Sequence, residues 1–166
     1  MLRADDMTEV KSLADLSTML EIVDHMRSPD EALVRECLDW ACRDQATHNL
    51  MVSLLDRALS EPAFRSSLYI ATVRRQGEVE ALALRSDYPK LSVSATADLD
   101  AIEKLVALVA LDMPDLPCVL GPQVEASRFA DAWRSLTKLV GVPGIAQRIY
   151  RLSQVISSAP VPGLLR

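Results

Sequence analysis

The chain has 166 residues, a formal net charge of −5 and three cysteines, with 49% hydrophobic and 25% charged residues. This balance is typical of a globular domain that buries a core without disulfides, and the negative charge argues against a nucleic-acid-binding protein. No apolar run approaches the roughly 20 residues of a membrane span, and an odd number of cysteines suits a reducing compartment. We therefore expect one soluble cytoplasmic domain with no nucleic-acid or membrane partner.

Helices are predicted for the N-terminal part of the chain. Residues 7–26 carry an apolar stripe at helical spacing, and a strand beginning at residues 2–4 is the alternative. A second helix is expected to start at residues 28–31, with Ser28 as its cap, Pro29 at its first position and Glu31 completing a capping box. The apolar pattern pauses near residues 45–47, resumes at Leu50 and is closed by Pro62, which favours two helices over one.

Three strands are expected next, over residues 68–73, 79–84 and 91–95. Gln76-Gly77 supplies the reversal between the first two strands. The first two strands are apolar on both faces, a pattern typical of a sheet that helices cover on both sides. Arg74-Arg75, beside the turn, is the only paired basic step and is expected to be solvated.

The rest of the chain alternates helices and strands. A helix over residues 97–111 is predicted, capped by Thr96, with an inner strand over 117–120 and a helix over 124–139. The inward residues of these helices are expected to be Ile102, Leu105, Val106, Val109, Phe129, Trp133 and Leu136. A turn at 141–144 and a long strand over 145–155 follow, and two prolines and a glycine make residues 157–166 an extended linker.

The order of these elements predicts an α/β (α+β) fold. Its centre is a mixed, mostly antiparallel sheet with helices on both faces, formed by a single domain over residues 1–156.

Few residues are candidates for catalysis or metal binding. Cys37, Cys42 and His48 suggest a metal site, but their spacing fits no standard zinc motif, and we expect buried apolar packing and no metal. His25 and His48 lack a serine or cysteine nucleophile in a hydrolase motif. Glu78 and Glu80 share one face of a strand under regular alternation; they are either an acid–base pair or solvated carboxylates.

Several stretches resemble a known family. GEVEALALRSDYPKLSVS, LPCVLGPQVEASRFADAWRSL, QRIYRLSQV and THNLMVSLLDRAL are similar to the N-terminal half of bacterial tandem GNAT proteins, which are N-acetyltransferases. The resemblance covers residues 44–166. It implies a GNAT-like sheet, acetyl-CoA as the cofactor of the family, and a second GNAT domain or a second copy of the chain as partner.

The resemblance also implies a position for the cofactor. The strand over 91–95 would contact pantetheine through the backbone of Val93 and Ser94, and the loop over 96–100 would hold the pyrophosphate on free N–H groups. This loop contains no glycine and no basic residue but carries two carboxylates, Asp98 and Asp100. The helix over 124–139 lacks the tyrosine that often protonates the thiolate in the family, and Tyr150 lies on the next predicted strand.

These departures favour a degenerate GNAT-like half with a structural role, which does not catalyse alone and shapes the acceptor cleft of a catalytic domain. Two alternatives stay open. One is an active acetyltransferase with a nonstandard loop, in which Glu78 or Glu80 is the base. The other is an unrelated α/β module for dimerisation or ligand binding.

Overall fold

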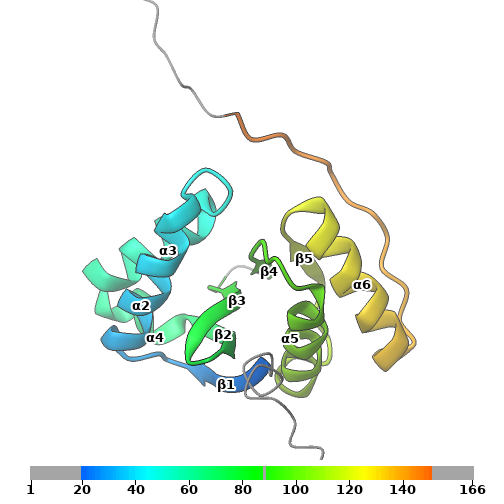
Figure 1. The fold of residues 1–166 in the computed structure, drawn as a ribbon, viewed down its shortest axis with the longest axis horizontal. Helices are drawn as coiled ribbons and strands as arrows, with labels where there is room; N and C mark the ends of the chain where they lie inside the picture. Colours follow the sequence, from blue (N-terminus) through cyan, green and yellow to red (C-terminus); the bar gives the residue numbers. More distant parts are fainter. Residues whose placement is uncertain (1–19, 88, 151–166) are drawn as a thin grey trace, which may run out of the picture.

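The computed structural model describes residues 20–87 and 89–150. A five-stranded sheet forms its centre, in the order β1-β2-β3-β4-β5 (Figure 1). Its strands are β1 Leu20–Arg27, β2 Tyr69–Arg75, β3 Glu78–Arg85, β4 Lys90–Val93 and β5 Cys118–Leu120. The first four strands pair antiparallel and β5 pairs parallel to β4, which confirms the expected mixed, mostly antiparallel sheet.

Helices form a layer on each face of the sheet, as expected (Figure 1). The first layer holds α2 Glu31–Ala41, α3 Asn49–Ser60 and α4 Pro62–Ser67, with a short 3-10 helix over Cys42–Asp44 between α2 and α3. The second layer holds α5 Leu99–Asp112 and α6 Gln123–Thr137. Within the described ranges, no helix is long and apolar enough to cross a membrane.

Alternate residues along the strands point to opposite faces of the sheet and pack into two separate cores. Ile70 of β2 lies opposite Leu84 of β3, and both pack under α2 and α3. The next pair along the strands, Ala71 and Ala83, faces α5 and α6. Strands buried on both sides carry apolar residues at successive positions, which explains the continuous apolar runs in the sequence.

The hairpin between β2 and β3 follows the sequence prediction. Gln76 and Gly77 both have positive φ, 53° and 82°, as a two-residue type I′ turn requires. The inward-facing residues predicted for α5 are buried, and Met113 is the C-cap of that helix.

The prediction of a helix over residues 7–26 is wrong for its last part, because residues 20–27 form strand β1 and pair with β2. Residues 7–19 and the alternative strand at 2–4 lie outside the described residues.

Both predicted helix caps are two residues early. Asp30, not Ser28, caps α2 and accepts from the Leu33 N–H at 2.8 Å, whereas Ser28 has a φ of 60° and ends the β1 segment. Asp98, not Thr96, caps α5 and accepts from the Asp100 N–H. Asp is as good a cap as Ser and better than Thr, and at helix N-termini it also complements the dipole.

The C-terminal part differs most from the predictions. Strand β5 is the outer strand of the described sheet, not an inner one, and Leu136 is 55% exposed. Residues 141–144 form no turn, and residues 145–150 belong to no strand. The remaining predictions, for residues 151–155 and 157–166, lie outside the described residues.

The prediction that Arg74 is solvated is wrong. Arg74 is only 9% exposed, and its guanidinium holds both carboxylate oxygens of Glu36 on α2, with Nη2 2.8 Å from Oε2. This ion pair ties the hairpin to the first helical layer, whereas a solvated edge was expected.

Candidate functional site

The loop between β4 and α5, residues 94–98, lies where the two helical layers meet the end of the sheet. Ser94 starts it and is fully buried. Its N–H donates to the Leu82 carbonyl, and its Oγ accepts from the Leu82 N–H, both at 2.9 Å. The hydroxyl therefore replaces the backbone carbonyl in the last step of the β3–β4 ladder, which leaves the chain free to turn away.

Side chains bind the backbone N–H groups that follow. Four amides in a row of six residues donate to acceptors from three parts of the chain. The pairs are Ala95 N–H with His48 Nε2 at 3.2 Å, Thr96 N–H with Glu125 Oε1 at 3.2 Å, Asp98 N–H with Thr96 Oγ1 at 3.1 Å, and Asp100 N–H with Asp98 Oδ1 at 2.9 Å. Four of the backbone donors in this stretch are therefore already taken by acceptors within the molecule.

His48 reaches the loop from the start of α3. The residue is 8% exposed, and its ring stacks on Trp40 with the centroids 5.0 Å apart. Its Nδ1 lies 3.3 Å from the Ala41 carbonyl, while its Nε2 accepts from the Ala95 N–H. Both contacts are satisfied only by a ring that carries its single proton on Nδ1. Both ring nitrogens thus have a partner, Nε2 in the loop and Nδ1 at the end of α2.

Glu125 reaches the loop from the first turn of α6. Glu125 is 7% exposed, so the contact of its carboxylate with the Thr96 N–H is largely shielded from water. Sequence reasoning missed it, because an acid in a first turn is the common partner of a helix dipole. Only the packing of α6 beside the loop gives it a tertiary role.

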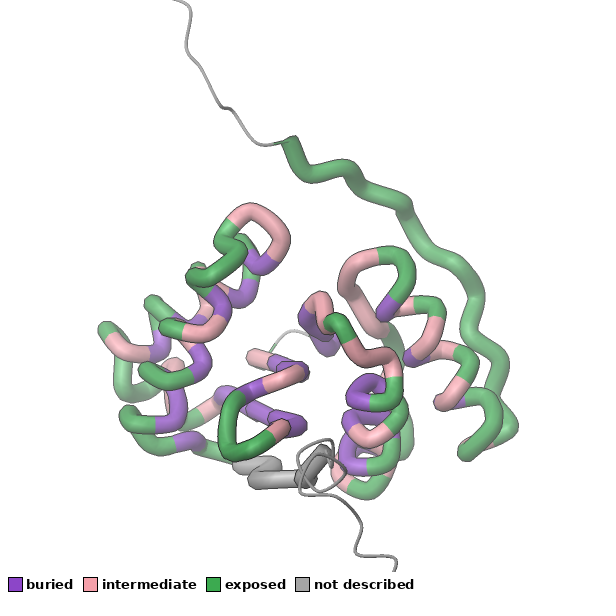
Figure 2. The backbone as a smooth tube through the Cα atoms, viewed as in Figure 1, coloured by how far each residue is buried: buried purple, intermediate pink, exposed green. Residues whose placement is uncertain are grey.

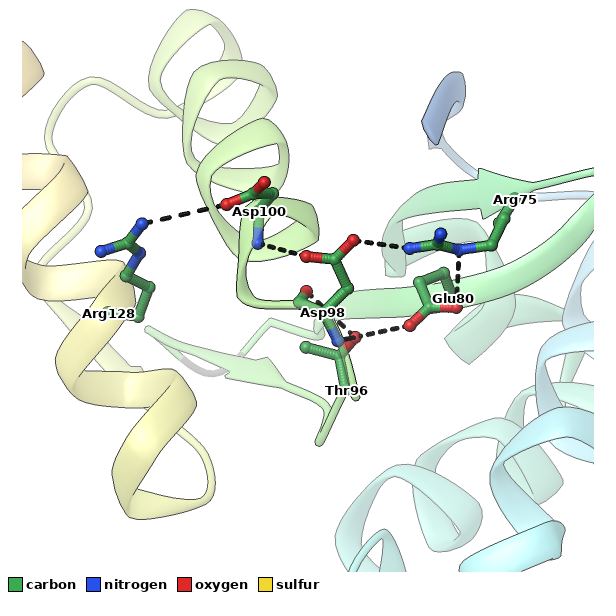
Figure 3. A network of polar contacts seen from close by, with 6 residues as sticks. All are labelled: Arg75, Glu80, Thr96, Asp98, Asp100 and Arg128. Atoms are coloured by element: carbon green, nitrogen blue, oxygen red, sulfur yellow. Dashed lines mark hydrogen bonds and ion pairs between the residues drawn. The ribbon is translucent and has the colours of Figure 1, made fainter. Parts of the chain in front are cut away.

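An acidic network surrounds the loop (Figure 3). Arg75 contacts Asp98 and Glu80, with Nε 3.5 Å from Glu80 Oε2. The Thr96 hydroxyl donates to Glu80 Oε1 at 3.0 Å. Arg128 of α6 pairs with Glu103 and lies 3.9 Å from Asp100. Carboxylates outnumber guanidinium groups here, so the local potential disfavours an incoming anion.

The structure does not bring Glu78 and Glu80 together as a pair. Val73 of β2 lies opposite Ala81 of β3, and the next residue, Arg74, lies opposite Val79. Glu80 is therefore an extra residue of β3 between these two pairs, in a β-bulge. Bulges interrupt the two-residue alternation of side chains along a strand. Glu78 pairs with Arg43 at 3.3 Å and is 75% exposed, whereas Glu80 is 20% exposed and faces Arg75.

Val93 and Ser94 are enclosed on both sides of β4. Val93 is opposite Ala83 of β3 and is 3% exposed. On the other side, β4 and β5 stay paired up to Ser92 and Leu120, and Gly121 follows closely. A Cβ on Gly121 would lie 2.8 Å from the Val93 carbonyl oxygen, so the absence of a side chain is what lets the two strands approach.

The cysteine and histidine positions do not form a metal centre in the described part of the chain, where no group of three suitable ligands is found. Cys37 is buried, and burial raises the pKa of its thiol to about 12. Cys42, in contrast, is exposed, so the expectation of apolar packing holds for Cys37 and is wrong for Cys42. The side chain of His25 lies outside the described residues.

Two hollows lie on the surface away from the loop. One, of about 450 Å³, is formed by residues 42–46, Asn49 and the end of the described chain at Ile149 and Tyr150. The other, of about 360 Å³, lies at the opposite end of the sheet beside Arg27, Tyr69 and Arg85. Arg27 there donates to the Asp112 carbonyl at the end of α5, so it caps a helix C-terminus.

Comparisons with protein-family models, with curated proteins and with solved structures found no match to this chain.

Proposed function

We propose that the chain is a GNAT-like domain that does not bind acetyl-CoA by itself and acts as a structural partner of a catalytic domain or of a second copy. The observation that supports this most strongly is that four backbone N–H groups of residues 95–100 already donate to acceptors within the molecule. A pyrophosphate needs backbone N–H groups that are free to donate. Here His48, Glu125, Thr96 and Asp98 already accept from four of them.

The charge around the loop supports the same proposal. To reach the Thr96 N–H, a phosphate would have to displace the Glu125 carboxylate, and it would lie beside Asp98 and Glu80. Like charges at such distances repel by several kcal/mol when water is excluded, and by less at a surface. The residues of this loop therefore do not fit the cofactor.

Among the described residues, no tyrosine is recorded in contact with the loop, where an active member is expected to have one. Helix α6 contains none, and Tyr150 is 82% exposed in a segment that belongs to no strand. The described cysteines are all unpaired, which agrees with the cytoplasm as the proposed location.

The test is calorimetric titration of the full chain with acetyl-CoA, with CoA as the control. We expect no heat and no thermal shift up to about 1 mM ligand, which corresponds to binding weaker than roughly −4 kcal/mol. Amide chemical shifts of Ala95, Thr96 and Asp98 should stay unchanged during the titration. Saturable micromolar binding that moves these amides would overturn the proposal and favour the active acetyltransferase instead.

A further inference from the structure

An extended apolar arm follows α6. Lys138 ends the helix with a φ of 67°, and residues 138–150 then run without helix or strand, every one of them exposed (Figure 2). Six large apolar residues lie in this stretch with 57–88% of their surface in water: Leu139, Val140, Val142, Ile145, Ile149 and Tyr150. Contiguous apolar exposure of this kind marks an interaction surface in a folded protein.

The backbone of the arm is also without partners. In the part of the chain that the structure describes, no hydrogen bond is recorded for the backbone groups of residues 140–150. Because Pro143 has no N–H, the part of the arm that can pair as a strand lies after it, and residues 145–150 are the glycine-free portion of that part. Alternation places Ile145 and Ile149 on one face of that strand, and Arg148 and Tyr150 on the other.

The sheet offers a matching edge. Strand β5 pairs with β4 on one side and is the last strand of the described sheet on the other. Such an edge presents a row of unpaired N–H and C=O groups. Val119, at its centre, packs against the core beneath α5 and α6, so an added strand with Ile145 and Ile149 on the same face would extend that core.

The arm does not take this place in its own chain. It leaves the C-terminal end of α6, passes along the outer side of that helix and ends near the loop between α2 and α3 (Figure 1). Within residues 20–87 and 89–150, every copy therefore carries one extended segment and one sheet edge that have no recorded strand partner and that complement each other.

We propose that residues 145–150 of one copy add to the open edge of β5 in a second copy, and that the reciprocal contact closes a two-fold dimer. The inference rests on the assembly role in the proposed function and names the partner as a second copy of this chain.

The area is sufficient. Six residues of extended chain expose about 950 Å². If docking covers about half of that surface and an equal area of the edge, two arms bury roughly 1,900 Å² in total, which lies in the range of stable dimers.

The first test is the mass of the full chain in solution, by light scattering over a range of concentrations. We expect a dimer, and we expect Ile149→Asp and Gln147→Pro to give monomers with unchanged circular dichroism. Val124→Asp is the matched control, because Val124 is an apolar residue of α6 that is 60% exposed and lies outside the arm. A monomeric parent chain would overturn the inference, as would a dimer that the arm variants leave intact.

The second test is disulfide trapping, which uses the exposed Cys118 of β5 in a Cys42→Ser background. Val119 points into the core, so its neighbour Cys118 points to the other face, as do residues 146 and 148 of an added strand. We expect Ala146→Cys or Arg148→Cys to form an interchain disulfide, and Gln147→Cys, on the opposite face, to form none. A disulfide within one chain would show that the arm folds back on its own sheet.

The two proposals fail separately. Neither the mass measurement nor the cross-linking involves acetyl-CoA. A monomeric chain would therefore overturn the strand exchange but not the proposed function, which the acetyl-CoA titration tests separately.

Discussion

Replacing Ser94 by alanine tests how the loop is held at its first residue. The substitution removes the oxygen that accepts from the Leu82 N–H, and both residues are fully buried. No other acceptor is recorded for that N–H, and a buried donor left without a partner costs about 1–3 kcal/mol. We therefore expect Ser94→Ala to lower the free energy of unfolding by about 2 kcal/mol.

Ser92→Ala is the matched control for this variant. Ser92 lies two residues earlier, is 6% exposed, and has no hydrogen bond recorded for its hydroxyl among the described residues. Its loss should change stability by less than about 0.5 kcal/mol.

Denaturant unfolding followed by tryptophan fluorescence measures both variants, because Trp40 stacks on His48 and Trp133 is buried against Phe129. For a chain of this size, 2 kcal/mol corresponds to a fall in Tm of about 4–8 °C, with an unchanged denaturant slope. Equal effects of Ser92→Ala and Ser94→Ala would refute the reasoning, because the loss would then not come from the orphaned amide.

Two other predictions concern titratable groups. Because burial raises the pKa of Cys37 to about 12, a thiol reagent at pH 8 should label Cys42 and Cys118 quickly and Cys37 only after unfolding; three fast thiols would contradict the described burial. The hydrogen bond from Arg74 holds the pKa of Glu36 below its usual 4.5, so the stability from this pair is present above that pH and is lost as the pH falls through the lowered value. The Glu36 side chain is 47% exposed, so solvent screening limits the effect to less than about 1 kcal/mol. The stability difference between the parent chain and Glu36→Gln should shrink between pH 6 and pH 3, and a difference that grows would contradict the assignment.

The sequence predicted the centre of the fold well because local chemistry decides it. A turn with Gly77 can hold the positive φ of a tight hairpin, and apolar runs of six residues fit strands covered on both faces. The apolar stripe of α5 also sets its buried face without reference to other elements.

The N-terminal strand could not be predicted in the same way. Leu20 and Val23 fit a helical stripe, but the backbone of residues 20–27 pairs with β2, a partner about 50 residues away. Tertiary pairing of this kind overrides local propensity. The prediction of a strand from residue 145 onward fails over residues 145–150 for a related reason: an apolar pattern favours a strand, but a strand forms only where the backbone has a partner to pair with.

The candidate site was located by resemblance, but its geometry could not be foreseen. The sequence showed that the loop lacks glycine and carries Asp98 and Asp100, and it gave no sign that His48 and Glu125 would reach the loop amides. The bulge at Glu80 was equally hidden, since one extra residue is enough to break the alternation on which the pairing of Glu78 with Glu80 depended.

The contacts at Ala95 and Thr96 have a consequence for how the molecule unfolds. These adjacent amides are held by side chains from opposite layers, His48 from the α2–α3 side and Glu125 from α6. Neither layer can separate from the sheet without releasing one of them, so this dipeptide mechanically couples the two cores. Hydrogen exchange at these two positions should therefore follow the opening of each layer individually, and together they report whether the domain unfolds as one cooperative unit or as two.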